Sequence, residues 1–263
     1  MFDRIFEGQT VLITGGAGGF GRSASRLFAE RGANLVLSDF NEAGLADHAK
    51  SLKADGYQVA TLDGSVADEE HCQKTVDMAM REFGRLDIAI NNAGISHEPA
   101  KTAEVDSAEA RMTIAVDLMG VFYGMKHQIP PMQDAFESEG RRSSILNIAS
   151  LAGIGGAPTL SMYAAAKHGV VGLTKSAALE YARRGIRINA LCPAFARTPM
   201  VEDGLLAGAD GDKQAEDHLT RGIPMRRLAE PEEITQSMLW ICDPRNSFMT
   251  GQAVALDGGT SAM

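Results

Sequence analysis

Three side chains able to move a proton lie close together in this sequence: Ser150, Tyr163 and Lys167. Tyr163 and Lys167 are four residues apart in the Ala-rich run 162–168, which predicts a helix with both side chains on one face. A free tyrosine has a pKa of roughly 10, so its use as a base requires a charge that stabilises the phenolate, and Lys167 supplies an ammonium. Ser150 follows the apolar run 145–149, which indicates the end of a strand. The trio predicts an enzyme, although a tyrosine and a lysine at this spacing also occur by chance.

A glycine-rich turn near the start of the chain lies between a predicted strand and a predicted helix. The strand covers 10–14, the glycines fall within 15–21, and apolar residues at helical spacing follow over 22–31. Glycine lets a backbone approach a pyrophosphate, whose charge is met by the unpaired N–H groups at a helix N-terminus. The order strand, turn and helix therefore predicts a dinucleotide site.

An acidic residue follows the second predicted strand, 34–38. Asp39 lies 18 residues past Gly21, where a carboxylate suits the ribose hydroxyls of NAD and would repel the extra phosphate of NADP. No arginine or lysine flanks Asp39, and Phe40 follows it. The alternative is that Asp39 caps the helix predicted for 41–55. We expect NAD as the cofactor.

Strand and helix patterns alternate from Thr10 to about Leu256. The predicted strands are 10–14, 34–38, 57–62, 86–90, 143–148, 187–191 and 253–256. This alternation favours an α/β fold: a single Rossmann-like, doubly wound domain over 1–263, with a seven-stranded, mostly parallel sheet and helices on both faces. The glycine turn, the run 91–94 and Ser150 all follow strands, so we expect them at one edge of that sheet.

Composition narrows the classes of partner. A formal charge of -9 and a pI near 5.2 argue against nucleic acid as a partner. The first residues lack the apolar core of a signal peptide, and no stretch approaches the ~20 apolar residues that cross a bilayer. Three scattered cysteines and six histidines show neither a disulfide framework nor metal-ligand spacing. We expect a cytoplasmic protein with a small-molecule substrate, no membrane or nucleic-acid partner, and no metal.

Together these residues resemble the short-chain dehydrogenase/reductase family over nearly the whole chain. The resemblance rests on the turn from Thr14 to Gly21 (TGxxxGxG), the run 91–94 (NNAG), and the trio Ser150, Tyr163 and Lys167. It implies hydride transfer between NAD and a secondary alcohol or ketone, in which Tyr163 exchanges the proton, Ser150 holds the oxygen and Lys167 also binds the nicotinamide ribose. The cofactor-binding residues that it implies are Gly15, Gly19, Phe20, Gly21, Asp39, Phe40, Ser65, Val66, Asn91, Ala93, Gly94, Tyr163, Lys167, Pro193 and Thr198.

The chain departs from the family pattern at three positions. Asp117 stands where the family usually has the asparagine that completes a catalytic tetrad and helps to hold a water relay behind the lysine. An aspartate would keep the relay and add a negative charge near Lys167, so Asp117 is included among the catalytic residues. Ala194 replaces a usual glycine after Pro193, and Ser65 stands where an aspartate often contacts the adenine.

Substrate and assembly are expected from the resemblance. In relatives a mobile lid follows the sixth strand, here about 199–225. Apolar residues in or near this segment favour a largely apolar cyclic, aromatic or steroid-like alcohol or ketone, although packing explains them equally well; they are Leu151, Met162, Phe195, Met200, Val201, Leu205, Leu206 and Ile223. Relatives pair through two helices, here about 104–127 and 160–184, which implies a homotetramer or a dimer.

Two other functions stay open. One is a catalytically reduced sensor or scaffold that binds NAD, and Asp117 is the feature that leaves room for it. The other is an enoyl reductase, but relatives of that type space the tyrosine and lysine more widely than four.

Overall fold

The computed structural model describes residues 4–205 and 212–263. Seven strands form one sheet in the order β3-β2-β1-β4-β5-β6-β7. Their bounds are β1 (Thr10–Thr14), β2 (Asn34–Asp39), β3 (Val59–Asp63), β4 (Ile88–Asn91), β5 (Ser143–Ile148), β6 (Ile186–Pro193) and β7 (Ala253–Leu256). Each strand pairs in parallel with its neighbours. The chain winds outward from β1 to β3 and then from β4 to β7, which confirms the predicted doubly wound fold.

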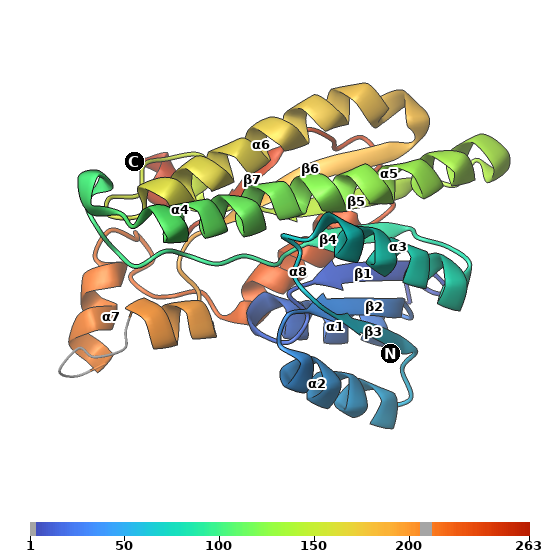
Figure 1. The fold of residues 1–263 in the computed structure, drawn as a ribbon, viewed down its shortest axis with the longest axis horizontal. Helices are drawn as coiled ribbons and strands as arrows, with labels where there is room; N and C mark the ends of the chain where they lie inside the picture. Colours follow the sequence, from blue (N-terminus) through green and yellow to red (C-terminus); the bar gives the residue numbers. More distant parts are fainter. Residues whose placement is uncertain (1–3, 206–211) are drawn as a thin grey trace.

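Helices cover both faces of the sheet (Figure 1). Their bounds are α1 (Gly19–Glu30), α2 (Glu42–Ala54), α3 (Glu69–Phe83), α4 (Ser107–Ile114), α5 (Gly120–Glu139), α6 (Ser161–Tyr181), α7 (Asp212–Thr220) and α8 (Pro231–Cys242). One face carries α1, α2 and α8, and the other carries α3, α5 and α6. None of the described helices is long and apolar enough to span a bilayer.

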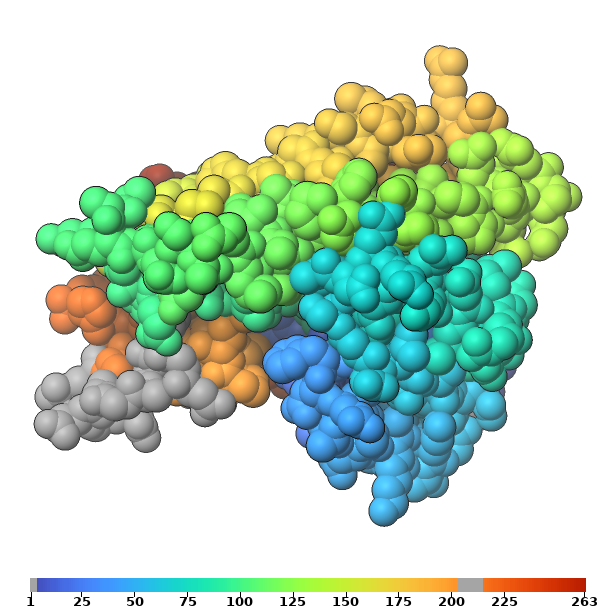
Figure 2. Space-filling model, in the orientation of Figure 1, coloured from blue at the N-terminus to red at the C-terminus, as the bar shows by residue number. Residues whose placement is uncertain are grey.

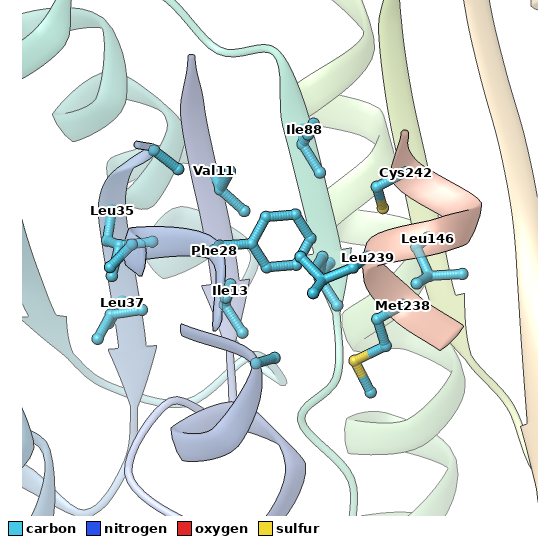
Figure 3. Close-up of a cluster of buried hydrophobic side chains, with 14 of the residues drawn as sticks. Val11, Ile13, Phe28, Leu35, Leu37, Ile88, Leu146, Met238, Leu239 and Cys242 are labelled. Atoms are coloured by element: carbon cyan, nitrogen blue, oxygen red, sulfur yellow. The ribbon is translucent and has the colours of Figure 1, made fainter. Parts of the chain in front are cut away.

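The strands supply apolar side chains to both faces, as a covered parallel sheet requires. In β1, Val11 and Ile13 belong to one hydrophobic cluster, whereas Leu12 belongs to the other. Figure 3 shows the first cluster, where the ring of Phe28 from α1 lies between β1 and Leu239 of α8. The core thus clamps helices to both sides of the strands whose ends carry the predicted site.

Several predicted bounds need correction. The strand predicted at 57 begins at Val59, because the N–H of Tyr57 donates back to Leu52 O in the turn that follows α2. The strand predicted at 86 begins at Ile88; Asp87 before it uses its carboxylate to accept a bond from Thr10 N at 2.8 Å. At the other end of the sheet, β6 extends the predicted 187–191 by three residues in total, to 186–193.

The helix predicted for 104–127 differs most from the structure. It is α4, then a π-helical turn over Ala115–Met119, then α5, which continues to Glu139. The second half contains Pro130 and Pro131, and proline removes a helix hydrogen bond. Burial of a continuous apolar face against the sheet outweighs that loss; its members are Val121, Met125, Ile129 and Met132.

The segment predicted as a lid holds a π-helical stretch, Met200–Leu205, and helix α7. Leu206 lies outside the described residues. Val201 packs with Leu228 and Phe195 in a small cluster, so packing accounts for its burial. On the face shown in Figure 2, a notch separates blue α2 from the orange chain that follows β6.

Candidate active site

Ser150 and helix α6 meet at the C-terminal edge of the sheet. Ser150 follows β5 and begins a short 3-10 turn, Leu151–Gly153, in which its Oγ accepts a bond from Ala152 N at 3.1 Å. This turn presses against α6, since a Cβ at Gly153 would lie 2.7 Å from Lys167 O. The close approach brings Ser150 together with the side chains that α6 carries.

Tyr163 and Lys167 project from one face of α6, as their spacing predicts. The Lys167 Nζ lies 5.4 Å from the centroid of the Tyr163 ring. Lys167 is 3% exposed, and its ammonium donates to Ile148 O at 3.0 Å. The positive charge that a phenolate at Tyr163 would need is therefore held in place from β5.

Asp117 forms a fully buried ion pair with the same lysine. Its Oδ2 lies 3.2 Å from Lys167 Nζ, and its Oδ1 accepts a bond from Ile95 N at 2.8 Å. Burial disfavours both charges. It raises the pKa of Asp117, although the Lys167 ammonium acts in the opposite direction. Burial also opposes the charge of Lys167, but the Asp117 carboxylate overcomes this, so the pKa of Lys167 lies above its usual value. Asp117 sits in the π-helical turn, an irregularity common at functional sites.

The loop after β4 is fastened to the glycine turn after β1. Thr14 Oγ1 accepts bonds from Asn92 N and Ala93 N at 3.0 and 3.1 Å. In return Asn92 Nδ2 donates to Thr14 O and Gly15 O. The predicted site residues include Asn91, Ala93 and Gly94 but not Asn92, although Asn92 belongs to the same run 91–94. It holds the two loops together across the β1–β4 boundary.

Asn91, predicted as a cofactor residue, turns its side chain into the core. Its Nδ2 donates to Asn147 Oδ1 at 2.9 Å, and its Oδ1 accepts from Gln128 Nε2 at 2.8 Å. Asn147 in turn donates to Thr174 on α6 at 2.9 Å. This buried network ties β4, β5, α5 and α6 together beneath the site, so Asn91 positions the loop that follows it.

The glycine turn forms an open cradle at the start of α1. Gly15 and Gly19 adopt φ of +69° and +45°, and a Cβ at Gly21 would lie 1.9 Å from Gly15 O. These three positions therefore need glycine. Gly18 caps α1 without a side chain, which leaves the N–H groups of the first turn for a ligand. Thr198 borders the cradle, since a Cβ at Gly19 would lie 3.6 Å from its Cγ2.

Asp39 lies beside this cradle. Its Oδ2 accepts a bond from Ala17 N, and its Oδ1 accepts one from Asn41 N, both at 2.9 Å. Asn41 is the residue that caps α2, through a bond from Gly44 N, so the alternative role for Asp39 as that cap is wrong. Phe40 is 78% exposed next to it.

The remaining predicted cofactor residues lie on the loops of the same edge. Ser65 is exposed after β3, and its Oγ accepts a bond from Ala67 N at 3.2 Å. Val66 is buried against the start of α5, because a Cβ at Gly120 would lie 2.7 Å from its Cγ2. Pro193 ends β6, and Gly94 lies beside the buried pair, where a Cβ would be 3.3 Å from Asp117 Oδ2. The donor-rich cradle and these loops fit a dinucleotide.

Comparison with known proteins agrees with this geometry. A family model described as Enoyl-(Acyl carrier protein) reductase matches residues 15–261. A solved levodione reductase superposes with a TM-score of 0.92 at 35% identity, over 98% of this chain and 99% of that one. The chain belongs to the short-chain dehydrogenase/reductase family. A 3-ketoacyl-(acyl-carrier-protein) reductase from Brucella melitensis, solved in complex with NADH, gives a TM-score of 0.89 at 32% identity, over 97% of this chain and 99% of that one.

Two sequence relatives act on six-membered carbon rings, according to their names. The 2,5-dichloro-2,5-cyclohexadiene-1,4-diol dehydrogenase of Sphingobium indicum is 38% identical over 258 residues, 98% of each chain. The cis-4-hydroxycyclohexanecarboxylate dehydrogenase of Sinomonas cyclohexanicum is also 38% identical over 258 residues, again 98% of each chain. This short-chain dehydrogenase/reductase therefore matches such enzymes over nearly its full length.

With Tyr163 as the predicted base of alcohol oxidation, the Asp117–Lys167 pair predicts a pH effect on that reaction. The carboxylate cancels part of the ammonium charge that stabilises the phenolate. We expect Asp117→Asn to move the rising limb of kcat/KM against pH to lower pH by about one unit, equivalent to about 1.4 kcal/mol. The measurement is the pH profile of cyclohexanol oxidation.

Asp87→Asn is the matched control for this prediction. Asp87 is also a buried carboxylate, paired with Arg85 at 2.7 Å, but it lies before β4 at the opposite edge of the sheet. Its substitution should lower stability and leave the midpoint unchanged. A midpoint that stays in place for Asp117→Asn would mean that the Asp117 carboxyl is neutral.

Proposed function

We propose that the protein is an NAD-dependent dehydrogenase of cyclic secondary alcohols, working reversibly with the corresponding ketones. The observation that carries the proposal is the buried ammonium of Lys167, which lies 5.4 Å from the centroid of the Tyr163 ring at the edge of the sheet where Ser150 follows β5. The ring-containing substrates named for the relatives support the substrate class. The three free, buried cysteines suit a reducing compartment, and we place the enzyme in the cytoplasm.

The cofactor would lie across the β1–β4 boundary. The cradle of Gly15, Gly19 and Gly21 would bind its pyrophosphate, and Asp39 would accept bonds from the adenosine ribose hydroxyls. Gly94 and Thr198 would lie nearer the nicotinamide. When bound, the cofactor would supply the hydride chemistry.

The protein's own part is to position the substrate and to move one proton. Ser150 would donate a hydrogen bond to the substrate oxygen and hold it beside Tyr163. In oxidation Tyr163, as phenolate, would accept the hydroxyl proton; in reduction the phenol would return it. Lys167 would stabilise the phenolate and bind the nicotinamide ribose. Burial of the lysine strengthens this effect because the surroundings have a low dielectric.

Absorbance of NADH tests the reaction. Given NAD and either cyclohexanol or cis-4-hydroxycyclohexanecarboxylate, the protein should form NADH, and Tyr163→Phe should lower kcat by at least about 1000-fold because the phenyl ring cannot accept a proton. The control is Tyr57→Phe, the same change at a tyrosine that precedes β3 at the opposite edge of the sheet, and this variant should stay active. NAD binding without turnover of any ring alcohol would favour the sensor alternative.

Cofactor choice depends on Asp39 in this proposal. Asp39→Ala removes the carboxylate that would repel a ribose phosphate, so we expect the ratio of kcat/KM for NADP to that for NAD to rise about tenfold or more. The control is Asp55→Ala, at the far end of α2, where the ratio should not change. A wild-type preference for NADP would contradict the assignment of Asp39.

We also propose that the chain assembles as a homotetramer or a dimer through α5 and α6. Leu179 on α6 is 85% exposed and Phe122 on α5 is 40% exposed, and contact with a second copy of the chain would remove both side chains from water. Light scattering should give a multiple of the 28.0 kDa chain mass, and Leu179→Arg should reduce it. Wild-type protein that remains at 28.0 kDa at micromolar concentration would refute the proposal.

A further inference from the structure

His97 is a buried histidine that the trio does not use. It is 4% exposed and lies in the loop between β4 and α4. Its Nδ1 lies 2.8 Å from Glu98 O, and its Nε2 lies 3.3 Å from Met162 N. A carbonyl oxygen can only accept and a backbone N–H can only donate, so Nδ1 carries the proton and Nε2 accepts. The contacts therefore define a neutral imidazole with one tautomer.

The bond from Met162 N to His97 lies in the first turn of α6. Met162 lies in the first turn of α6, next to Tyr163, and Leu160 at the N-cap offers no side-chain cap. The first N–H groups of a helix have no partner within the helix, and a capping acceptor stabilises the turn that contains them. The His97 imidazole supplies that acceptor from another part of the chain.

The approach to α6 carries backbone strain. Thr159 has φ of +67°, a conformation that is rare for a β-branched residue. Its carbonyl accepts a bond from Ala100 N at 3.0 Å, three residues past His97 in the same loop. The loop therefore makes two bonds to the start of α6, one at Thr159 and one at Met162.

The other side of the loop is anchored as well. Ile95 N donates to Asp117, and Glu98 N donates to Glu109 Oε2 on α4 at 3.1 Å. A cavity of about 170 Å³ adjoins the imidazole, lined by Ser96, Met112 and others. The hydrogen bonds of both ring nitrogens fix the orientation of the imidazole in this loop.

Resting on the proposed function, we propose that His97 is a positioning residue for the dehydrogenase: its neutral imidazole caps α6 and so fixes Tyr163 relative to Ser150. Both ring nitrogens are occupied by backbone groups, so the imidazole does not act on substrate. Its effect reaches the reaction through the first turn of α6. Small displacements of a proton-transfer group lower rates steeply, which makes this cap a determinant of turnover.

Substitution of His97 by glutamine and by asparagine distinguishes loss of the cap from a change in burial or polarity, because both replacements are polar amides. Glutamine can place its Oε1 where Nε2 lies and accept from Met162 N, whereas asparagine is one methylene shorter and cannot reach. We expect His97→Asn to slow single-turnover NADH formation from NAD and cyclohexanol about tenfold, with the dissociation constant for NAD within about twofold. His97→Gln should stay within about threefold of the wild-type rate. In the Asn variant alone, amide hydrogen exchange in residues 160–163 should accelerate.

His48→Asn controls for the loss of any buried histidine. His48 is 5% exposed, and its Nε2 lies 2.7 Å from Ser25 Oγ between α1 and α2. It should affect stability without slowing the single turnover. Equal rates and equal exchange in the Asn and Gln variants would overturn the proposal, as would a similar slowing in His48→Asn.

The exchange measurement also separates the two proposals. If wild-type protein turns over no ring alcohol with NAD or NADP, the proposed function fails, yet exchange at 160–163 still shows whether His97 caps α6. If wild-type protein is active and the Asn variant matches it in both rate and exchange, only the role of His97 fails.

Discussion

The buried ammonium of Lys167 is the interaction on which the organisation of the site depends. An isolated charge inside a protein is costly unless it is paired and hydrogen-bonded. Here α6 supplies the lysine, the end of β5 supplies the carbonyl of Ile148, and the π-helical turn supplies Asp117. Satisfying one cation therefore fixes the relative positions of a strand and two helical segments. The same three elements carry or border Ser150 and Tyr163.

A second constraint is the need to satisfy the polar groups where the strands end. The amide of Asn91 bonds those of both Gln128 and Asn147 below the site, and Asn147 extends the network to Thr174. Such a network is rigid when its members are all bonded, because every displacement leaves a polar group unpaired. It holds β4 and β5 in register, so the loops after them leave the sheet from defined points.

The parallel arrangement of the strands also separates the sheet, which forms the framework, from the loops at its C-terminal edge, which can determine specificity. All strand ends that matter lie on one edge, and the cradle opens at the β1–β4 boundary where the winding direction reverses. This framework is shared with reductases and dehydrogenases of different named substrates. Loops at such an edge can vary without disturbing the sheet, and here they include the loop that bears His97 and the segment after β6.

The sequence by itself determined the alternation of strands and helices, the glycine turn after β1 and the position of Tyr163 and Lys167 on one face of a helix. Strand and helix periodicities depend on neighbouring residues, and the spacing of Tyr163 and Lys167 is a property of one helix. The sequence did not predict contacts between distant segments. These are the bond from α6 to His97, the burial of the Asn91 side chain in the core and the bonds between Asn92 and Thr14. The continuation of α5 through Pro130 also depends on burial against the sheet, which outweighs the local preference of proline. Only tertiary structure decides these features, because each joins groups whose separation along the chain carries no periodic signal.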